Sequence, residues 1–221
     1  MIGMKYGSVV RIVDNNYIKY LLTVIRNKDT SPVTFRRTIR MIGVLMGYEI
    51  AGDLNYKKIS VITPLKAKAN GVSITQLNDI ILVNILRAAT PLIEGLQEIF
   101  FEAKLGIILL QRKEVDAIEK IDSILYFSKL PKITPNDLII IADPALATGS
   151  TLIKAIKTIK DMAPENKIVI ASVISTKYGI NRIRNFTADK VRIYTVEIDS
   201  KLNKRGYILP GLGDAGDRAF G

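Results

Sequence analysis

Cysteine and histidine are both absent from this sequence of 221 residues. Without cysteine, disulfide bonds, thiolate catalysis and thiolate metal sites are excluded. Without histidine, a serine nucleophile activated by histidine is excluded, so acid–base chemistry falls to Asp, Glu, Lys, Tyr or water. Carboxylate sites for a hard cation such as Mg²⁺ remain open, because an ion carried by substrate phosphates needs few protein ligands.

The sequence also lacks an apolar run long enough to cross a membrane. The segments Ile80–Leu86 and Leu105–Leu110 are too short to span a bilayer. Charged residues from Lys5 onward interrupt the N-terminus, which therefore does not resemble a secretory signal. A hydrophobic content of 48% is nevertheless high enough to exclude disorder. We therefore expect a cytoplasmic protein with no membrane segment.

No linker, internal repeat or low-complexity tract divides the chain, so we expect a single domain over residues 1–221. Apolar periodicity predicts helices at residues 18–27, 32–53, 91–99, 151–162 and 178–185, and strands at residues 58–63, 72–75, 80–86, 105–110, 138–142, 167–175 and 191–197. This alternation is typical of an α/β fold with a doubly wound, mainly parallel sheet flanked by helices, preceded here by an N-terminal helical segment. Ligands bind at the carboxyl ends of the strands in such sheets. Arg87, Arg112 and Asp143 all follow such ends, which predicts one shared site.

The segment from Leu138 to Thr151 predicts an anion site. An aliphatic run that suits a buried strand ends at Asp143, and a helical pattern begins directly after Thr151. Between them, Thr148-Gly149-Ser150-Thr151 can offer hydroxyls and backbone amides to a phosphate, helped by the positive end of the helix dipole. The alternative is an ordinary capped turn, since turns rich in Gly, Ser and Thr are common. The segment is neither a Walker P-loop nor a G-x-G-x-x-G motif, which weakens triphosphatase and dinucleotide functions.

The C-terminal segment, residues 206–221, holds five of the 15 glycines. A glycine-rich terminus is usually a mobile polar tail. This one carries apolar residues that predict docking on the domain, namely Tyr207, Ile208, Leu209, Leu212 and Phe220. Glycine permits close backbone approach and positive φ angles, which suits the recognition of a flat polar heterocycle by main-chain groups.

The net charge of +11 comes from 32 Lys and Arg against 21 Asp and Glu. A basic balance favours nucleic-acid binding, but these charges are dispersed, and a phosphate-rich substrate benefits equally from positive potential. One denser patch, Arg36–Arg40, is typical of an amphipathic helix, and the alternative is an allosteric site for nucleotide phosphates. The inward residues of that helix would be Phe35, Ile39, Ile42 and Leu45. The mixed-charge segment 112–135 is either a surface hairpin or a lid over the phosphate pocket, and we favour the lid.

The loop Asp143–Thr151 and the tail Tyr207–Gly221 together resemble the uracil phosphoribosyltransferase family, and the similarity to its archaeal type extends through most of the chain. Three further segments resemble parts of that family: Asn84–Ala89 its pyrophosphate loop, Gln111–Arg112 its second arginine, and Leu125–Pro131 the segment before its central strand. The most specific match is residues 210–218, because other phosphoribosyltransferases share the phosphate loop but not this ending.

Two departures from the family pattern stand out. Ala89-Thr90 occurs where many members have Gly-Leu, and Ala145 replaces a commoner Met or larger residue. Neither removes a ligand, although the first restricts how closely the loop backbone can meet pyrophosphate.

The resemblance implies a type I phosphoribosyltransferase fold with a hood or lid excursion. It implies transfer of ribose 5-phosphate from phosphoribosyl pyrophosphate (PRPP) to N1 of uracil, giving UMP and pyrophosphate for pyrimidine salvage. The implied catalytic residues are Arg87, Arg112, Asp143 and Asp214. The implied PRPP-binding residues are Arg87, Arg112, Asp143, Pro144, Ala145, Leu146, Ala147, Thr148, Gly149, Ser150, Thr151 and Asp214. The implied uracil-binding residues are Ile208, Gly213, Asp214 and Ala215. Mg²⁺ is expected to arrive with PRPP and to meet Asp143 or Asp214 only through water.

The resemblance also implies regulation by GTP and assembly into a homo-oligomer, either a dimer or a tetramer. The expected GTP site is Arg37, Thr38, Ile39, Arg40 and Met41. Whether GTP or CTP is the effector stays open, and no general base for uracil N1 is identified. One alternative is a sibling enzyme that uses another base, and the tail argues against it. The other alternative is a phosphoribosyltransferase-fold regulator of pyrimidine genes that binds RNA, and the basic charge favours it. The complete tail and both arginines argue for small-molecule substrates and against a nucleic-acid partner.

Overall fold

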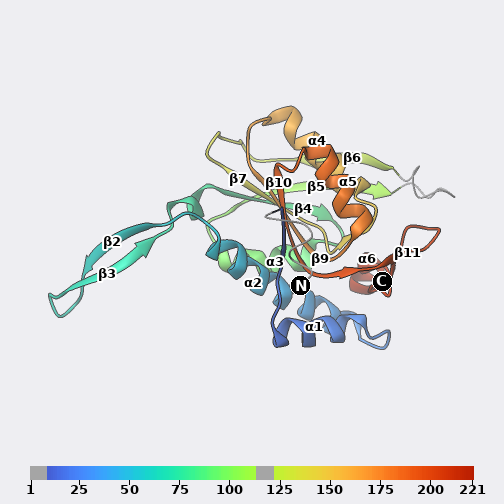
Figure 1. The fold of residues 1–221 in the computed structure, drawn as a ribbon, viewed down its shortest axis with the longest axis horizontal. Helices are drawn as coiled ribbons and strands as arrows, with labels where there is room; N and C mark the ends of the chain where they lie inside the picture. The colour runs from blue at the N-terminus through green and yellow to red at the C-terminus, as the bar shows by residue number, and fades with distance from the viewer. Residues whose placement is uncertain (1–8, 113–121) are drawn as a thin grey trace.

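The computed structural model of the chain describes residues 9–112 and 122–221, and the side chain of Arg112 also falls outside the described part. Its centre is a sheet built from β1 (Val10–Ile12), β4 (Ile80–Leu86), β5 (Lys104–Arg112), β6 (Ser123–Lys129), β7 (Leu138–Ala142), β9 (Ile168–Thr176) and β10 (Val191–Asp199). The order across the sheet is β1-β10-β9-β7-β4-β5-β6, and β8 (Ala145–Leu146) pairs with β9 beside this path. All neighbours run parallel except β5 and β6 (Figure 1).

The central strands β4, β7 and β9 are buried along nearly their whole length. Helices cover both faces of the sheet, so these strands form continuous aliphatic runs instead of alternating with polar residues. The strands predicted at residues 80–86 and 138–142 are confirmed with the same bounds. The sheet also contains β1 and β6, which apolar periodicity did not predict, because β1 has three residues and most side chains of β6 are exposed.

Two helical layers enclose the sheet (Figure 1). One layer contains α1 (Asn16–Arg26), α2 (Pro32–Gly52) and α3 (Thr90–Ile99), and the other contains α4 (Ser150–Met162) and α5 (Lys177–Thr187). Side chains cap the first turns of α1, α2 and α5, where Asn15, Ser31 and Thr176 accept backbone N–H groups. The doubly wound, mainly parallel arrangement predicted from the sequence is therefore confirmed.

The helices α2 and α3 approach each other closely. A Cβ atom added to Gly95 would lie 1.9 Å from the carbonyl oxygen of Arg40, and one added to Gly43 would lie 2.4 Å from that of Leu92. Glycine at both positions lets the two backbones touch, which fixes α3 and the loop that precedes it.

A two-stranded hairpin of β2 (Lys57–Ile62) and β3 (Lys68–Ser73) projects from the body of the molecule (Figure 1). The 3₁₀ helix η3 (Thr75–Asp79) leads from it into β4. No helix in the described part of the chain is long and apolar enough to cross a membrane.

The segment 112–135, for which a lid is favoured, contains β6 as an antiparallel neighbour of β5. This pairing is that of a hairpin at the sheet edge. Residues 113–121, where the two strands connect, lie outside the described residues, so the lid stays a prediction.

Candidate active site

A cleft of about 250 Å³ opens at the carboxyl ends of β4, β5, β7 and β9. Segments distant in the sequence line it: Ile85, Leu86, Ala88, Leu110, Asp143, Pro144, Ala145, Ala147, Thr151, Ile174, Gly206, Tyr207, Ile208, Gly213, Asp214, Ala215 and Gly216. The predicted phosphate loop and the predicted base-binding tail therefore face one another across a single cleft. This is the sheet edge at which α/β proteins bind ligands.

The phosphate loop passes from β7 into α4 through Gly149, whose φ angle is 80°. The residue before α4, Gly149, has no side chain that could cap the helix, which begins at Ser150, and the Ser150 N–H donates only a long hydrogen bond, of 3.5 Å, to Thr148 Oγ1. The next amides of the first turn and the positive end of the helix dipole are thus available to an anion. Thr151, in that first turn, lines the cleft.

The three loop hydroxyls are already hydrogen-bonded in this structure. Thr148 Oγ1 and Ser150 Oγ are buried and 2.8 Å apart, and Thr151 Oγ1 lies 3.2 Å from Ser123 Oγ on β6. The Thr148–Ser150 pair therefore keeps one hydroxyl proton to donate elsewhere. Of the residues from Asp143 to Thr151, those that do not line the cleft are Leu146, Thr148, Gly149 and Ser150.

Helix α5 and its capping residue contact the backbone carbonyl groups of the phosphate loop. The hydroxyl of Thr176 donates to the carbonyl of Ala147 at 2.6 Å, and Arg182 donates to the carbonyl of Thr148 at 3.0 Å. A Cβ added to Gly179 would lie 2.5 Å from the carbonyl oxygen of Ala147. The loop backbone thus rests directly on the first turn of α5.

Asp143 lies half-buried in the cleft wall at the end of β7. Burial raises the pKa of its carboxyl group to about 6, and the hydrogen bond from the Ala145 N–H, at 3.1 Å, acts in the opposite direction. The group is therefore mostly ionised at pH 7 but gains a proton within about one pH unit below it.

Arg87 follows β4 and is exposed. Its guanidinium nitrogen lies 3.8 Å from Asp217 Oδ1, and the group lies 6.0 Å from the ring centroid of Phe220. Arg87 therefore stands beside the C-terminal helix at the rim of the cleft. Arg112 ends β5, opposite Ser123 of β6, and its side chain is outside the described residues.

The C-terminal tail docks as predicted, but through fewer anchors. It forms β12 (Ile208–Leu209), paired with β11 (Lys201–Leu202), and then α6 (Ala215–Phe220). Ile208 and Leu212 are buried, whereas the predicted anchors Leu209 and Phe220 are exposed. Their side chains lie on the outer side of the tail, so burial is supplied by Ala215 and Ala219 instead.

The four residues predicted to bind uracil all line the cleft: Ile208, Gly213, Asp214 and Ala215. Asp214 is exposed and caps α6, because its Oδ1 accepts the Asp217 N–H at 3.0 Å. Asp214 nevertheless lines the cleft.

The segment predicted to bind GTP lies on α2. Thr38 and Ile39 are buried, while Arg37, Arg40 and Met41 are exposed, and Arg40 is paired with Glu98. Phe35, Ile39 and Ile42 face the core and Leu45 is partly buried, which confirms the amphipathic helix.

Comparison with known proteins decides the family. The family model for uracil phosphoribosyltransferase matches residues 12–221. The chain belongs to the uracil phosphoribosyltransferase family. It is 44% identical over 215 residues to the uracil phosphoribosyltransferase of Metallosphaera sedula, covering 96% of this chain and 99% of that protein. It is 48% identical over 206 residues to that of Sulfurisphaera tokodaii, covering 91% and 94%. The solved structure of the AQ2163 protein from Aquifex aeolicus superposes with a TM-score of 0.84 at 31% identity, covering 96% of this chain and 97% of that one.

Membership of the uracil phosphoribosyltransferase family confirms the resemblance seen in the sequence, the type I phosphoribosyltransferase fold and the prediction of a pentosyltransferase. Sequence reasoning missed Leu110 and Ile174 of the cleft wall. Both lie toward the carboxyl ends of parallel strands, so the strand-end rule that selected Arg87 could have found them. It also missed Thr176 and Arg182, for which no local motif existed.

Family membership implies Mg²⁺, and the donor set of the cleft fits a particular way of binding it. The described residues contain no group of three or more carboxylates that could form a metal cage. The cleft lining does include two carboxylate residues, Asp143 and Asp214. This sparse oxygen set fits an ion that keeps several waters and is held mainly by substrate phosphates.

Proposed function

We propose that this chain transfers the 5-phosphoribosyl group of PRPP to N1 of uracil, giving UMP and pyrophosphate in pyrimidine salvage. The observation that carries the proposal is a single cleft that is lined both by Thr151, at the start of α4, and by the uracil-type tail. In the reaction the N1–C1′ bond forms, the C1′–O bond to pyrophosphate breaks and the N1 proton is released.

The phosphate loop is proposed to hold the 5-phosphate of PRPP. Thr151, in the first turn of α4, lines the cleft, and its N–H and hydroxyl groups are proposed to donate hydrogen bonds to phosphate oxygens. The carboxylates of Asp143 and Asp214 are proposed to meet the ribose hydroxyls or water on Mg²⁺. When bound, Mg²⁺ supplies positive charge to the pyrophosphate oxygens of the substrate.

Arg87 and Arg112 are proposed to bind the pyrophosphate group. Charge grows on pyrophosphate as the C1′–O bond breaks, and a fixed guanidinium stabilises that charge more than it stabilises the ground state. Arg87 stands at the rim of the cleft and its ion pair with Asp217 is long and exposed, so it is free to turn to a ligand at little cost.

Uracil is proposed to bind against Ile208, Gly213, Asp214 and Ala215, where main-chain N–H and C=O groups can match O2, N3–H and O4. Cytosine has the opposite polarity at position 4 and would leave a buried donor facing a donor. An unpaired buried group costs about 1–3 kcal/mol, which corresponds to roughly a 5- to 150-fold preference for uracil.

Three further properties belong to this proposal. We propose that GTP binds at Arg37–Met41 and regulates activity, supported by the exposed cations Arg37 and Arg40 on α2. We also propose a homo-oligomer and a cytoplasmic location. Binding of GTP is tested by calorimetry on the wild type and on Arg37→Gln, with loss of the heat in the variant expected.

The deciding assay mixes purified protein with PRPP, Mg²⁺ and, in separate reactions, uracil, cytosine, hypoxanthine or orotate. UMP and pyrophosphate from uracil alone are expected, with activity lost in Arg87→Ala and Asp214→Ala. Folded protein that forms no nucleotide with any of the four bases would refute the proposed enzymatic activity and favour the RNA-binding regulator. That alternative predicts RNA affinity that falls steeply with salt, because it depends on phosphate contacts.

A further inference from the structure

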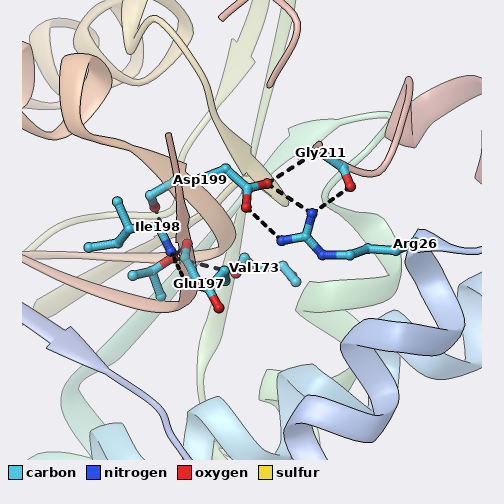
Figure 2. Close-up of polar contacts among 8 residues, drawn as sticks. Arg26, Val173, Glu197, Ile198, Asp199 and Gly211 are labelled. Atoms are coloured by element: carbon cyan, nitrogen blue, oxygen red, sulfur yellow. Dashed lines mark hydrogen bonds and ion pairs between the residues drawn. The ribbon is translucent and has the colours of Figure 1, made fainter. Parts of the chain in front are cut away.

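A partly buried ion pair outside the cleft holds the base-binding tail. Arg26, the last residue of α1, donates to the two carboxylate oxygens of Asp199 at 2.7 Å and 3.0 Å. Asp199 ends β10, and the side chains of Asp199 and Arg26 are 5% and 21% exposed. Figure 2 shows the two groups in the fork geometry that a planar guanidinium and a carboxylate form.

Gly211 is bonded to this ion pair through both of its backbone polar groups. Its N–H donates to Asp199 Oδ2 at 3.0 Å, and its carbonyl accepts from Arg26 at 2.9 Å (Figure 2). A residue bonded on both sides in this way cannot rotate either flanking peptide without breaking a charge-assisted hydrogen bond. The pair therefore fixes the backbone of the tail at this point.

The fixed point is directly coupled to the cleft. Gly211 has a φ angle of 64°, and a Cβ atom added to it would lie 2.1 Å from the carbonyl oxygen of Ile208. The turn thus folds tightly back on Ile208, which lines the cleft, and Gly213 follows two residues later. A displacement of Gly211 would be transmitted to both residues.

The same helix end holds the tail at a second place. Arg218 donates to the carbonyls of Leu212, at 2.7 Å, and of Asn27, at 2.6 Å, and its guanidinium lies 4.4 Å from the ring centroid of Phe35. The positive group also sits at the negative end of α1, where a cation is stabilised. The tail is consequently attached to the α1 end of the molecule, whereas the phosphate loop is attached to α5.

We propose that Arg26 and Asp199 are positioning residues for base recognition: through Gly211 they place the main-chain groups that read uracil. The proposal rests on the proposed function. Neither residue lines the cleft, so neither is expected to touch a substrate. Because the phosphate loop has a different support, loosening the pair should impair the use of uracil far more than the use of PRPP.

The test uses the conservative variants Arg26→Lys and Asp199→Asn in the full chain. Lysine keeps the charge but cannot reach two acceptors in a planar fork, and asparagine keeps the shape but loses the charge. The matched controls are Arg184→Lys and Asp189→Asn, because that pair is also bonded through two nitrogens, at 2.7 Å and 3.3 Å, and lies at the far end of α5. Melting temperature, kcat and the KM values for uracil and PRPP are measured for each.

We expect the KM for uracil to rise at least about tenfold in both variants, as the loss of one charge-assisted hydrogen bond implies. The KM for PRPP should stay close to the wild-type value, and the controls should leave both constants unchanged. Equal changes in the two KM values, an unchanged KM for uracil, or unfolding of both variants would assign the pair a purely structural role and overturn the proposal.

Hydrogen–deuterium exchange separates this proposal from the proposed function. In the folded variants the peptide covering residues 207–220 should exchange faster than in the wild type, while the phosphate loop is unchanged. Unchanged exchange would show that the pair does not hold the tail. A wild-type chain that makes no UMP, with the exchange result as expected, would refute the uracil reaction and leave the attachment of the tail intact.

Discussion

Replacing Gly179 by alanine tests whether α5 sets the position of the phosphate loop. The new Cβ would lie 2.5 Å from the carbonyl oxygen of Ala147 and 3.0 Å from that of Leu146. Because both of these oxygens belong to the backbone, no side-chain rotation can relieve the contact, and the loop itself must move. An ordinary contact begins at 3.4 Å, so restoring it requires a displacement of about 0.9 Å, and misplacement of about 1 Å near an active site can cost about a hundredfold in rate.

The substitution should nevertheless leave the fold intact. Overpacking usually costs about 1–3 kcal/mol. Alanine in place of glycine in a helix returns up to about 1 kcal/mol. We therefore expect a melting temperature a few degrees lower, together with a fall of about tenfold or more in kcat/KM for PRPP.

The matched control is Gly52→Ala, at the end of α2, where an added Cβ meets no atom within 4 Å. Steady-state kinetics with PRPP varied at saturating uracil, and differential scanning fluorimetry, measure the two effects for each variant. The control should have wild-type kinetics. A Gly179→Ala protein with wild-type kcat and KM for PRPP would refute the argument that the loop rests rigidly on α5.

Three further predictions concern charge. Burial raises the pKa of Asp143 to about 6, above its ordinary value of 3.8. The native state therefore binds the carboxyl proton of Asp143 more tightly than the unfolded chain does, and the stability of the fold falls as pH rises from about 4 to about 6. Asp143→Asn should therefore have a free energy of unfolding above pH 6 that exceeds the wild-type value by at most about 3 kcal/mol. The variant should also lose the limb near pH 6 in the profile of kcat/KM for PRPP. A profile with the same limb would contradict a role for this carboxylate. Arg87→Ala should lower kcat about 100-fold or more with unchanged stability, and an effect on KM alone would show that the arginine binds ground state and transition state equally. Burial opposes ionisation of Asp137, but hydrogen bonds from Lys104 and from the Thr134 N–H outweigh it and lower the pKa of this carboxyl group. The stabilisation of the fold by the ionised group is therefore complete above pH 3.8 and is lost as pH falls through the lower native pKa. Asp137→Asn should lower the unfolding free energy at pH 7 by about 1–3 kcal/mol in urea titrations, and no loss would show that the buried carboxylate is not needed.

The sequence alone determined the buried strands of the central sheet and the two chain segments that line the cleft. Strands such as β4 and β7 are buried on both faces, so their aliphatic runs are visible without knowledge of their neighbours. The phosphate loop and the tail are contiguous segments whose glycines and hydroxyls stand together in the chain. Local patterns of this kind are set by residues within a few positions of one another.

Tertiary structure decided everything that depends on contacts between distant residues. The exposed strand β6 acquires its place by pairing with β5, and no periodicity marks it. Asp143 acquires its raised pKa from burial that several segments create together. Arg26 and Asp199 are 173 positions apart, and only the packing of α1 against the end of β10 makes them the support of the tail. Such pairs leave no local trace because each residue, taken alone, is an ordinary charged side chain at the end of an element.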